Sequence, residues 1–379
     1  MKPWKAWIAP LLRRRDRLLA DRDFQRWSLR LPVARWIARR RMRALFDLCS
    51  GFVYSQVLLA CTRLGLLELL SQRPHSAAEL VECLALPRAS VDRLLEAAES
   101  LELIERRDIQ QFGLGPLGAA LLGNPAVSLM IEHHSALYAD LSDPVALLRK
   151  EHRTTDLGRF WAYSRTSDPA GLGPEDIAAY SDLMAASQVM IADQVLMAYP
   201  LQGSLRLLDV GGGAGAFAAA AMGRNPELQA RVFDLPSVCE RARQRFEDLD
   251  LGARAGACGG NFLTDPLPRG DDVISLIRVL HDHDDDAVMQ LLGAVRRAIA
   301  PGGVLLIAEP MLGTPGAEPV TAAYFGFYLM AMGQGRARTA DEIRSMLHEV
   351  GFGQVREHRT SAPLLVRTLT ARPRRSAKG

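Results

Sequence analysis

The chain of 379 residues is poor in cysteine: it has five, with no Cys-x-x-Cys spacing among them. An odd number of scattered cysteines argues against a disulfide framework and against a structural zinc site. No uninterrupted apolar run reaches the roughly 18 residues that a membrane span needs. The apolar core of the first residues is also too short for a signal peptide. These absences predict a protein of the reducing cytoplasm that is neither exported nor integral to a membrane.

The small net charge of +3 hides a strongly basic N-terminal arm. Residues 1–43 contain fourteen Lys and Arg against three Asp, together with four of the five tryptophans. Trp and Arg together are typical of an interfacial anchor on an anionic membrane. The alternative is a partly helical arm that packs on a partner subunit, and nucleic acid is a weaker third candidate.

Residues 44–125 have a helical pattern followed by two short helices and a small hairpin, which predicts a winged-helix module. Ser76 with Glu79 forms a capping box, and Ser90 is expected to start the next helix. DNA binding is the usual function of such a module. However, the stretch from Ser76 to Glu105 has seven acidic and two basic residues, whereas a DNA-reading face should be positive. Packing or dimerisation is the better interpretation, and we expect no nucleic-acid partner.

The rest of the chain divides by texture. Residues 126–200 are expected to be a helical connector that contributes to a substrate pocket. In residues 201–372, five apolar strands alternate with helices, which predicts an α/β fold with a doubly wound parallel sheet and a closing antiparallel pair. Residues 373–379 form a basic tail.

A glycine-rich turn, "LLDVGGGAGAF", follows the first of these strands. Glycines at 211, 213 and 215 allow a tight turn and a close approach of a ligand to the backbone. Asp234, at the end of the second strand, is placed to accept both hydroxyls of a ribose. The spacing also satisfies a dinucleotide fingerprint, so the residues alone leave NAD open.

Three features favour S-adenosylmethionine over NAD. Asp209 precedes the glycines and can bind a cationic amino acid group, where NAD would present a pyrophosphate. The glycine motif lies behind a helical domain. A Pro301-Gly302-Gly303 turn precedes the fifth strand.

With these motifs in place, the chain resembles the S-adenosylmethionine-dependent O-methyltransferases related to caffeic acid and acetylserotonin O-methyltransferases. The segments "DVGGGAG", "FDLP", "HDHDD", "PGGVLLIAEP" and "GRARTADEIRSMLHEVGF" fall in that family's order. The resemblance implies a Rossmann-like class I methyltransferase domain, preceded by a mostly helical winged-helix dimerisation domain, in a homodimer. Within the family, the basic start and "LFDLCSGFVYSQVLLACTRLGLLELL" are similar to bacterial hydroxyneurosporene and demethylspheroidene O-methyltransferases. These enzymes of carotenoid biosynthesis methylate a tertiary hydroxyl, which would place the protein at the inner or photosynthetic membrane.

The resemblance also assigns the histidine of "HDHDDD". His281 matches the general base, which removes the proton of the acceptor hydroxyl as its oxygen attacks the methyl group. Glu309 matches the residue that orients the imidazole through its other nitrogen. His283 is expected to be structural, and Asp284, Asp285 and Asp286 to cap the following helix. A metal site is disfavoured, since no other His or Cys with ligand spacing is near.

Two departures from the family pattern affect the site. Ala337 stands where the family commonly has a second carboxylate, so Glu309 would have to orient His281 alone. Asn261 and Phe262 replace the usual Asp-Met pair, and they can still bind and cover an adenine. We also expect Leu235, Arg278 and Ser187 to contact the cofactor.

An uncharged, aromatic segment from Pro319 to Gly335 is expected to line an apolar acceptor pocket. Its candidate lining residues are Tyr324, Phe327, Tyr328 and Met330, with Met184 from an earlier helix. A plain core helix is the other interpretation. The residues leave open a small phenol or polyketide acceptor, a tetrapyrrole methylated on carbon, and a ligand-sensing regulator without enzymatic activity.

Overall fold

The computed structural model describes residues 4–151, 154–162, 187–203 and 205–374. The chain divides into two units, Met1–Asn124 and Pro125–Gly379. Each is a folded body with contacts of its own, and they are described in turn. The domain limits expected at 43, 200 and 372 stay predictions.

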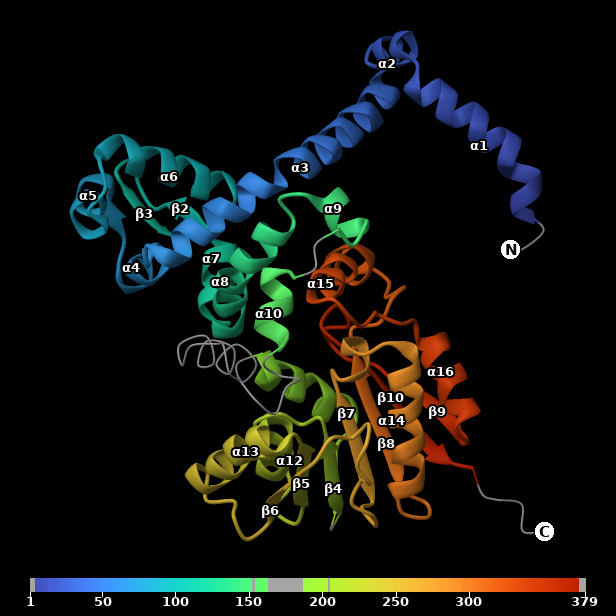
Figure 1. The fold of residues 1–379 in the computed structure, drawn as a ribbon. Helices are drawn as coiled ribbons and strands as arrows, with labels where there is room; N and C mark the ends of the chain where they lie inside the picture. The colour runs from blue at the N-terminus through green and yellow to red at the C-terminus, as the bar shows by residue number, and fades with distance from the viewer. Residues whose placement is uncertain (1–3, 152–153, 163–186, 204, 375–379) are drawn as a thin grey trace. The chain divides into compact units, whose positions relative to one another are not determined.

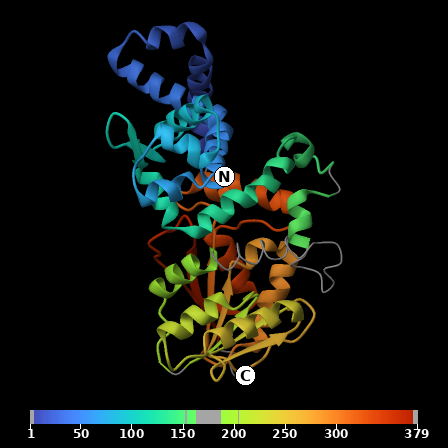
Figure 2. The same cartoon turned by 90° about the vertical axis from the view of Figure 1, so that its left-hand side faces the viewer.

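The first unit begins with three helices: α1 (Trp4–Ala20), α2 (Arg22–Ser28) and α3 (Pro32–Arg63). Asp21 caps α2, because its side chain accepts a hydrogen bond of 2.7 Å from the backbone N–H of Phe24. Pro32 occupies the first turn of α3, where its missing N–H costs no hydrogen bond. In both views, α2 and the N-terminal half of α3 lie away from the helices of this unit that follow α3 (Figures 1 and 2).

Helix α3 bears on the expectation that no uninterrupted apolar run is long enough to cross a membrane. It has 32 residues, and an 18-residue window within it has a mean hydropathy of 1.5, which is sufficient by length and composition. The apolar residues are interrupted by polar ones, so a search for an unbroken run missed the helix. This is weak support for a span, since the core helix of a soluble protein passes the same test.

The rest of the first unit has the elements expected of a winged helix. They are α4 (Leu66–Gln72), β1 (His75–Ser76), α5 (Ala77–Leu84), α6 (Arg88–Ser100), β2 (Ile104–Arg106), β3 (Gln111–Leu114) and α7 (Pro116–Leu122). The three strands form an antiparallel sheet in the order β1-β3-β2. The capping box of Ser76 and Glu79 is confirmed. The expected start at Ser90 is wrong: α6 begins at Arg88, directly after Pro87, whose fixed φ of −58° suits the N-cap position.

The second unit begins with α8 (Pro125–Asp140), α9 (Pro144–Leu148) and α10 (Asp156–Ala162), and residues 187–198 are also helical. The connector is therefore helical over its described part, as predicted.

A seven-stranded sheet follows, with the order β6-β5-β4-β7-β8-β10-β9. The five parallel strands, and the antiparallel pairing of β10 with β8 and β9, are as the sequence predicted. The predicted alternation with helices is broken once, because β6 is joined to β7 by a segment without a helix. In chain order the elements are β4 (Arg206–Val210), α12 (Ala216–Arg224), β5 (Gln229–Asp234), α13 (Pro236–Asp248), β6 (Ala255–Gly259), β7 (Val273–Ile277), the 3-10 helix η1 (Leu280–Asp282), α14 (Asp285–Ala298), β8 (Val304–Glu309), the π-helix η2 (Pro319–Tyr324), α15 (Phe325–Met332), α16 (Ala340–Glu349), β9 (Phe352–His358) and β10 (Arg367–Pro373).

Two apolar layers cover the sheet, because successive residues of a strand point to opposite faces. Leu305 and Ile307 pack with α14 and α16, whereas Leu306 and Ala308 pack with α12 and α13. Helices therefore cover both faces (Figure 1). Burial on both sides explains why the parallel strands read as nearly continuous apolar runs. It also leaves the carboxyl edge of the sheet as the place where polar loops gather.

Candidate active site

A cavity of about 640 Å³ opens where the parallel strands end. Loops after four strands contribute to its lining. The lining includes most of the residues predicted to bind the cofactor: Gly211, Gly213, Asp234, Leu235, Asn261, Phe262, Arg278 and Ser187. His281 lines the same cavity. The volume is in the range of small-molecule sites, and this edge of an open α/β sheet is where ligands bind.

The glycine turn and Asp234 form one side of the cavity. Gly213 has a φ of +57°, and a Cβ atom placed on it would meet nothing within 4 Å, so its backbone faces open space. Its N–H donates a hydrogen bond of 2.8 Å to one carboxylate oxygen of Asp234, and the N–H of Leu235 donates one of 2.7 Å to the other oxygen. Each oxygen keeps a lone pair for a ligand hydroxyl. Burial raises the pKa of Asp234. A ribose fits this bare backbone and doubly anchored carboxylate.

Gly215 and Asp209 lie near the cavity but not in its lining. A Cβ atom at Gly215 would meet the ring of Phe246, so this glycine serves the packing of the turn on α13. Asp209 is fully buried, and it accepts a hydrogen bond of 2.6 Å from the hydroxyl of Ser275. Burial raises its pKa to about 7, and its Oδ2 has no partner among the described residues. Direct contact of Asp209 with the cofactor therefore stays a prediction.

Asn261 and Phe262 follow β6. The side-chain carbonyl of Asn261 accepts a hydrogen bond of 2.9 Å from the N–H of Leu263, which leaves one lone pair for an adenine amine. Phe262 meets the ring of His283 edge to face, with centroids 5.3 Å apart. Arg278 has a φ of +58°, and its Nε is buried without a hydrogen bond among the described residues. An unpaired donor at a cavity wall is suited to a polar ligand.

His281 and Glu309 form a buried pair at the ends of neighbouring strands. The Nδ1 atom of His281 lies 2.7 Å from Oε2 of Glu309, and the two side chains are 7% and 3% exposed. Oε1 of Glu309 accepts hydrogen bonds of 2.9 and 2.6 Å from the backbone N–H groups of Val279 and Leu280. The carboxylate is thus fixed by the same loop that carries the histidine. Glu309 binds Nδ1, so Nε2 is the ring nitrogen that can take a proton from a substrate. Oδ1 of Asp282 lies 3.2 Å from Nε2.

The charges around His281 make it a stronger base than an isolated imidazole. Burial lowers the pKa of His281, and Arg278 lowers it further. The carboxylates of Asp282 and Glu309 outweigh both, so the net pKa lies above its ordinary value. A carboxylate that stabilises the imidazolium in this way favours proton uptake.

The predicted role of the three aspartates after His283 at the start of the helix is met only in part. Asp285 and Asp286 do lie in the first turn of α14, but the side chain of Asp284 makes no cap hydrogen bond. It accepts instead from the backbone N–H of Gly335, at 3.0 Å, and Asp285 binds Arg336 and Arg338. Groups about fifty residues away in the chain bind these carboxylates in place of the N–H groups at the helix end. The local spacing of residues cannot reveal such partners. Among the described residues, no three His, Cys, Asp or Glu side chains are grouped as metal ligands.

The aromatic segment supplies part of the cavity wall. Tyr324 and Tyr328 line the cavity, whereas Phe327 and Met330 are partly buried in an apolar cluster beside it. Met184 lies outside the described residues. The pocket assignments of Phe327, Met330 and Met184 therefore stay predictions.

Two histidines of α8 were missed by the sequence interpretation. Nε2 of His134 lies 2.9 Å from the hydroxyl of Tyr324, and Nε2 of His133 lies 2.8 Å from that of Tyr328. Burial lowers the pKa of His133 to about 4 and raises that of Tyr324 to about 12, so His133 and Tyr324 are uncharged near neutral pH. The adjacent histidines in an apolar helix were the available signal.

Comparisons with known proteins agree with this geometry. The model of an O-methyltransferase domain matches residues 138–353, and that of an O-methyltransferase dimerisation domain matches residues 46–124. Demethylspheroidene O-methyltransferase of Cereibacter sphaeroides is 41% identical over 355 residues, which cover 94% of this chain and 93% of that protein. The enzyme of the same name from Rhodobacter capsulatus is also 41% identical, over 90% of this chain and 85% of that protein.

Solved structures share the fold. The crystal structure of human N-acetylserotonin methyltransferase, in complex with S-adenosylmethionine, has a TM-score of 0.72 and 25% identity. The match covers 88% of this chain and 98% of that chain.

Proposed function

Because this chain belongs to the O-methyltransferase family that carries a dimerisation domain, we propose that it methylates the tertiary 1-hydroxyl group of an acyclic carotenoid, of the hydroxyneurosporene or demethylspheroidene type. The buried His281–Glu309 pair at the wall of the cavity carries the proposal. The general class is plain: the protein is an S-adenosylmethionine-dependent O-methyltransferase, and its dimerisation domain indicates a homodimer.

S-adenosylmethionine supplies an electrophilic methyl group on a sulfonium sulfur. Nε2 of His281 would take the hydroxyl proton as the acceptor oxygen receives this methyl group, and the sulfur would leave with the electrons of its former bond. Glu309 holds the other ring nitrogen and stabilises the charged imidazole. Gly213 and Asp234 would hold the ribose, with Asn261 and Phe262 at the adenine. Asp209 would bind the cationic amino acid part of the cofactor.

The acceptor is inferred from the cavity wall and from the relatives. Apolar side chains such as Met130, Ile191, Val320 and Phe325 line the cavity together with Tyr324 and Tyr328. Such a wall suits the end of a polyene with a single hydroxyl group. A tertiary alcohol is a weak acid, so its methylation would depend strongly on a positioned base.

The acceptor is tested with labelled S-adenosylmethionine and purified protein. The probes are a 1-hydroxycarotenoid in detergent, a bacteriochlorophyllide and a panel of catechols, each with His281→Ala in parallel. We expect label on the carotenoid and its loss in the variant. Label only on the tetrapyrrole or a catechol would refute the carotenoid acceptor and keep the enzyme class. Tight cofactor binding without transfer to any probe would favour a ligand-sensing regulator.

We also propose that residues 1–43 bring a cytoplasmic enzyme to the surface of an anionic membrane, the inner or the photosynthetic membrane. Large apolar side chains of the arm are exposed: Val33 is 75% and Trp36 is 63% accessible. The guanidinium of Arg40 lies 5.8 Å from the centre of the Trp36 ring. Exposed Trp beside Arg suits the interface between lipid headgroups and acyl chains. A membrane-dissolved acceptor would then be reached at its source.

Vesicle flotation separates this proposal from its alternative. Binding to phosphatidylglycerol vesicles but not to phosphatidylcholine vesicles, reversed by high salt, is the expected result. If the protein binds neither kind of vesicle, and the dimer is lost when residues 1–30 are deleted, the arm packs on the partner subunit.

A further inference from the structure

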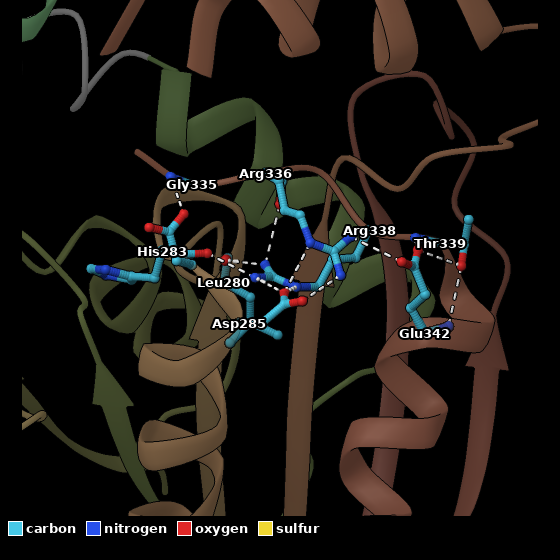
Figure 3. Close-up of polar contacts among 9 residues, drawn as sticks. Leu280, His283, Asp285, Gly335, Arg336, Arg338, Thr339 and Glu342 are labelled. Carbon is cyan, nitrogen blue, oxygen red and sulfur yellow. Dashed lines mark hydrogen bonds and ion pairs between the residues drawn. The ribbon is translucent and has the colours of Figure 1, made fainter. Parts of the chain in front are cut away.

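A network of polar contacts joins the loop that carries His281 to the segment before α16. The network, here called the Arg338 clamp, consists of Gly335, Arg336 and Arg338 on one side and residues 280–285 on the other (Figure 3). Its two sides are more than fifty residues apart in the chain, and both lie in the second unit.

Arg338 is the centre of the clamp. Its side chain is 1% exposed, and its guanidinium donates hydrogen bonds of 2.6 Å to the carbonyl of Leu280 and 2.8 Å to that of His283. These carbonyls lie on either side of His281. The same guanidinium donates to Asp285 Oδ1 at 3.0 Å from Nε and 2.7 Å from Nη2. Four donor contacts in one plane fit the fork of an arginine and not the single ammonium of a lysine.

Gly335 is the second close contact between the clamp and the loop of His281. A Cβ atom at this position would lie 2.3 Å from the carbonyl oxygen of His281, and the residue has a φ of +84°. Only a glycine allows both the left-handed conformation and this approach. Beside it, Gln334 donates to the carbonyl of Asp282 at 3.0 Å, and Arg336 binds both oxygens of Asp285 at 2.9 and 2.8 Å.

The backbone of Arg338 contacts the segment that follows Glu309, the other member of the His281–Glu309 pair. The N–H of Leu312 donates a hydrogen bond of 2.9 Å to the carbonyl of Arg338, and Leu312 is paired with Thr339 in a parallel bridge. Leu312 follows Glu309 by three residues in the chain. Arg338 is therefore bound to the loop of the histidine through its side chain and to the segment of the glutamate through its backbone.

We propose that Arg338 is a positioning residue for the His281–Glu309 pair. The inference rests on the proposed role of His281 as the general base. Ala337, which is buried among apolar side chains, offers no carboxylate to His281. The direction of the imidazole thus depends on Glu309 and on the backbone around the histidine. The clamp fixes that backbone, because Arg338 donates hydrogen bonds to the carbonyls of Leu280 and His283.

The test compares Arg338→Ala, Arg338→Lys and Gly335→Ala with the wild type and with Arg344→Ala as matched control. Arg344 is a partly exposed arginine of α16 that binds Asp341 and Glu357, outside the clamp. Three quantities are measured: kcat with the acceptor found in the panel, the Kd of S-adenosylhomocysteine, and the titration of His281 by NMR with labelled histidine. His281→Gln assigns the NMR signal.

Arg338→Ala is expected to lower kcat about a hundredfold, on the scale of a misplaced catalytic group, with the Kd unchanged. The NMR midpoint should also fall, because His281 moves away from Glu309. Asp282 and Arg278, the other charged groups near the ring, are unchanged in the variant, and Phe325, which covers the ring, is uncharged. Arg338→Lys should recover part of both losses, and Arg344→Ala should match the wild type.

A purely structural role gives a different pattern. In that case Arg338→Ala, Arg338→Lys and Gly335→Ala would lower the folded fraction, while the folded protein kept the wild-type midpoint and kcat; that result overturns the proposal. If Arg338→Ala does not fold, the other two variants decide. Full activity of His281→Gln would instead refute the role of His281 as the general base. The midpoints of the His281 titration would still show whether Arg338 positions the imidazole.

Discussion

Strand β8 and helix α3 are both rich in apolar residues, but they differ in what covers them. All six residues of β8 are buried within the second unit. Of the 32 residues of α3, only Leu59 and Cys61 are buried in the first unit. The apolar surface of β8 is covered within its own unit, whereas most of that of α3 is not covered by the first unit.

The match to the dimerisation domain suggests what covers part of α3. It begins at residue 46, within the helix, where Phe46 and Leu48 are 65% and 81% exposed. A second subunit would cover this half, and the basic residues before it are those proposed to meet lipid.

After the loss of His281 itself, the largest expected effect lies at the end of β8. Replacing Glu309 by Gln should lower kcat roughly a hundred- to a thousandfold, as expected for loss of an oriented general base. One amide oxygen cannot accept from Val279, Leu280 and His281 together as two carboxylate oxygens do. The Kd of S-adenosylhomocysteine serves as control and should not change.

The same variant gives a pH test. Neutral imidazole is the active base, so the rate rises with pH as His281 loses its proton. The nearby carboxylates raise the pKa of His281, and the acid limb of the wild type should therefore lie above the ordinary value of about 6.5. In Glu309→Gln one raising charge is gone, so the limb should shift to lower pH; an unchanged limb would contradict the pairing.

The next effect lies in the basic arm. Replacing Arg39, Arg40 and Arg41 by Gln should weaken partition onto anionic vesicles about a hundredfold, at about 1 kcal/mol per basic residue near the surface. Turnover of acceptor dissolved in detergent should stay as in the wild type. The matched control removes three exposed arginines of the second unit, Arg149, Arg356 and Arg359. Equal weakening by both sets would show that total charge, and not the arm, attracts the membrane.

The smallest effect is expected at the cofactor. Asp234→Asn should raise the Kd of S-adenosylhomocysteine about tenfold, the scale of one hydrogen bond to a charged group. The amide has one accepting oxygen where the carboxylate offers two, and the N–H groups of Gly213 and Leu235 compete for it. Isothermal titration measures the change, and an unaltered Kd would exclude a ribose at this carboxylate.

The sequence revealed the parts of the site whose signals are local. The glycine turn and His281 follow strands of the parallel sheet, and Asp234 and Glu309 are the last residues of theirs. The ends of such strands meet at one edge. It could not reveal Arg338, because that role depends on the approach of two segments far apart in the chain. The prediction that the Asp284 side chain caps a helix was wrong for the same reason. A rule about helix ends does not take account of the N–H of Gly335, which the fold brings to Asp284.

The central claim is that His281 removes the acceptor proton, and a single-turnover experiment tests it most directly. Wild type and His281→Gln are each saturated with labelled S-adenosylmethionine and mixed with 1-hydroxycarotenoid in detergent, after matched titrations with S-adenosylhomocysteine. We predict that the rate of label transfer falls on the order of a thousandfold in the variant, within the range of general-base contributions, with equal affinity for S-adenosylhomocysteine. A variant that transfers label at the wild-type rate would contradict the account.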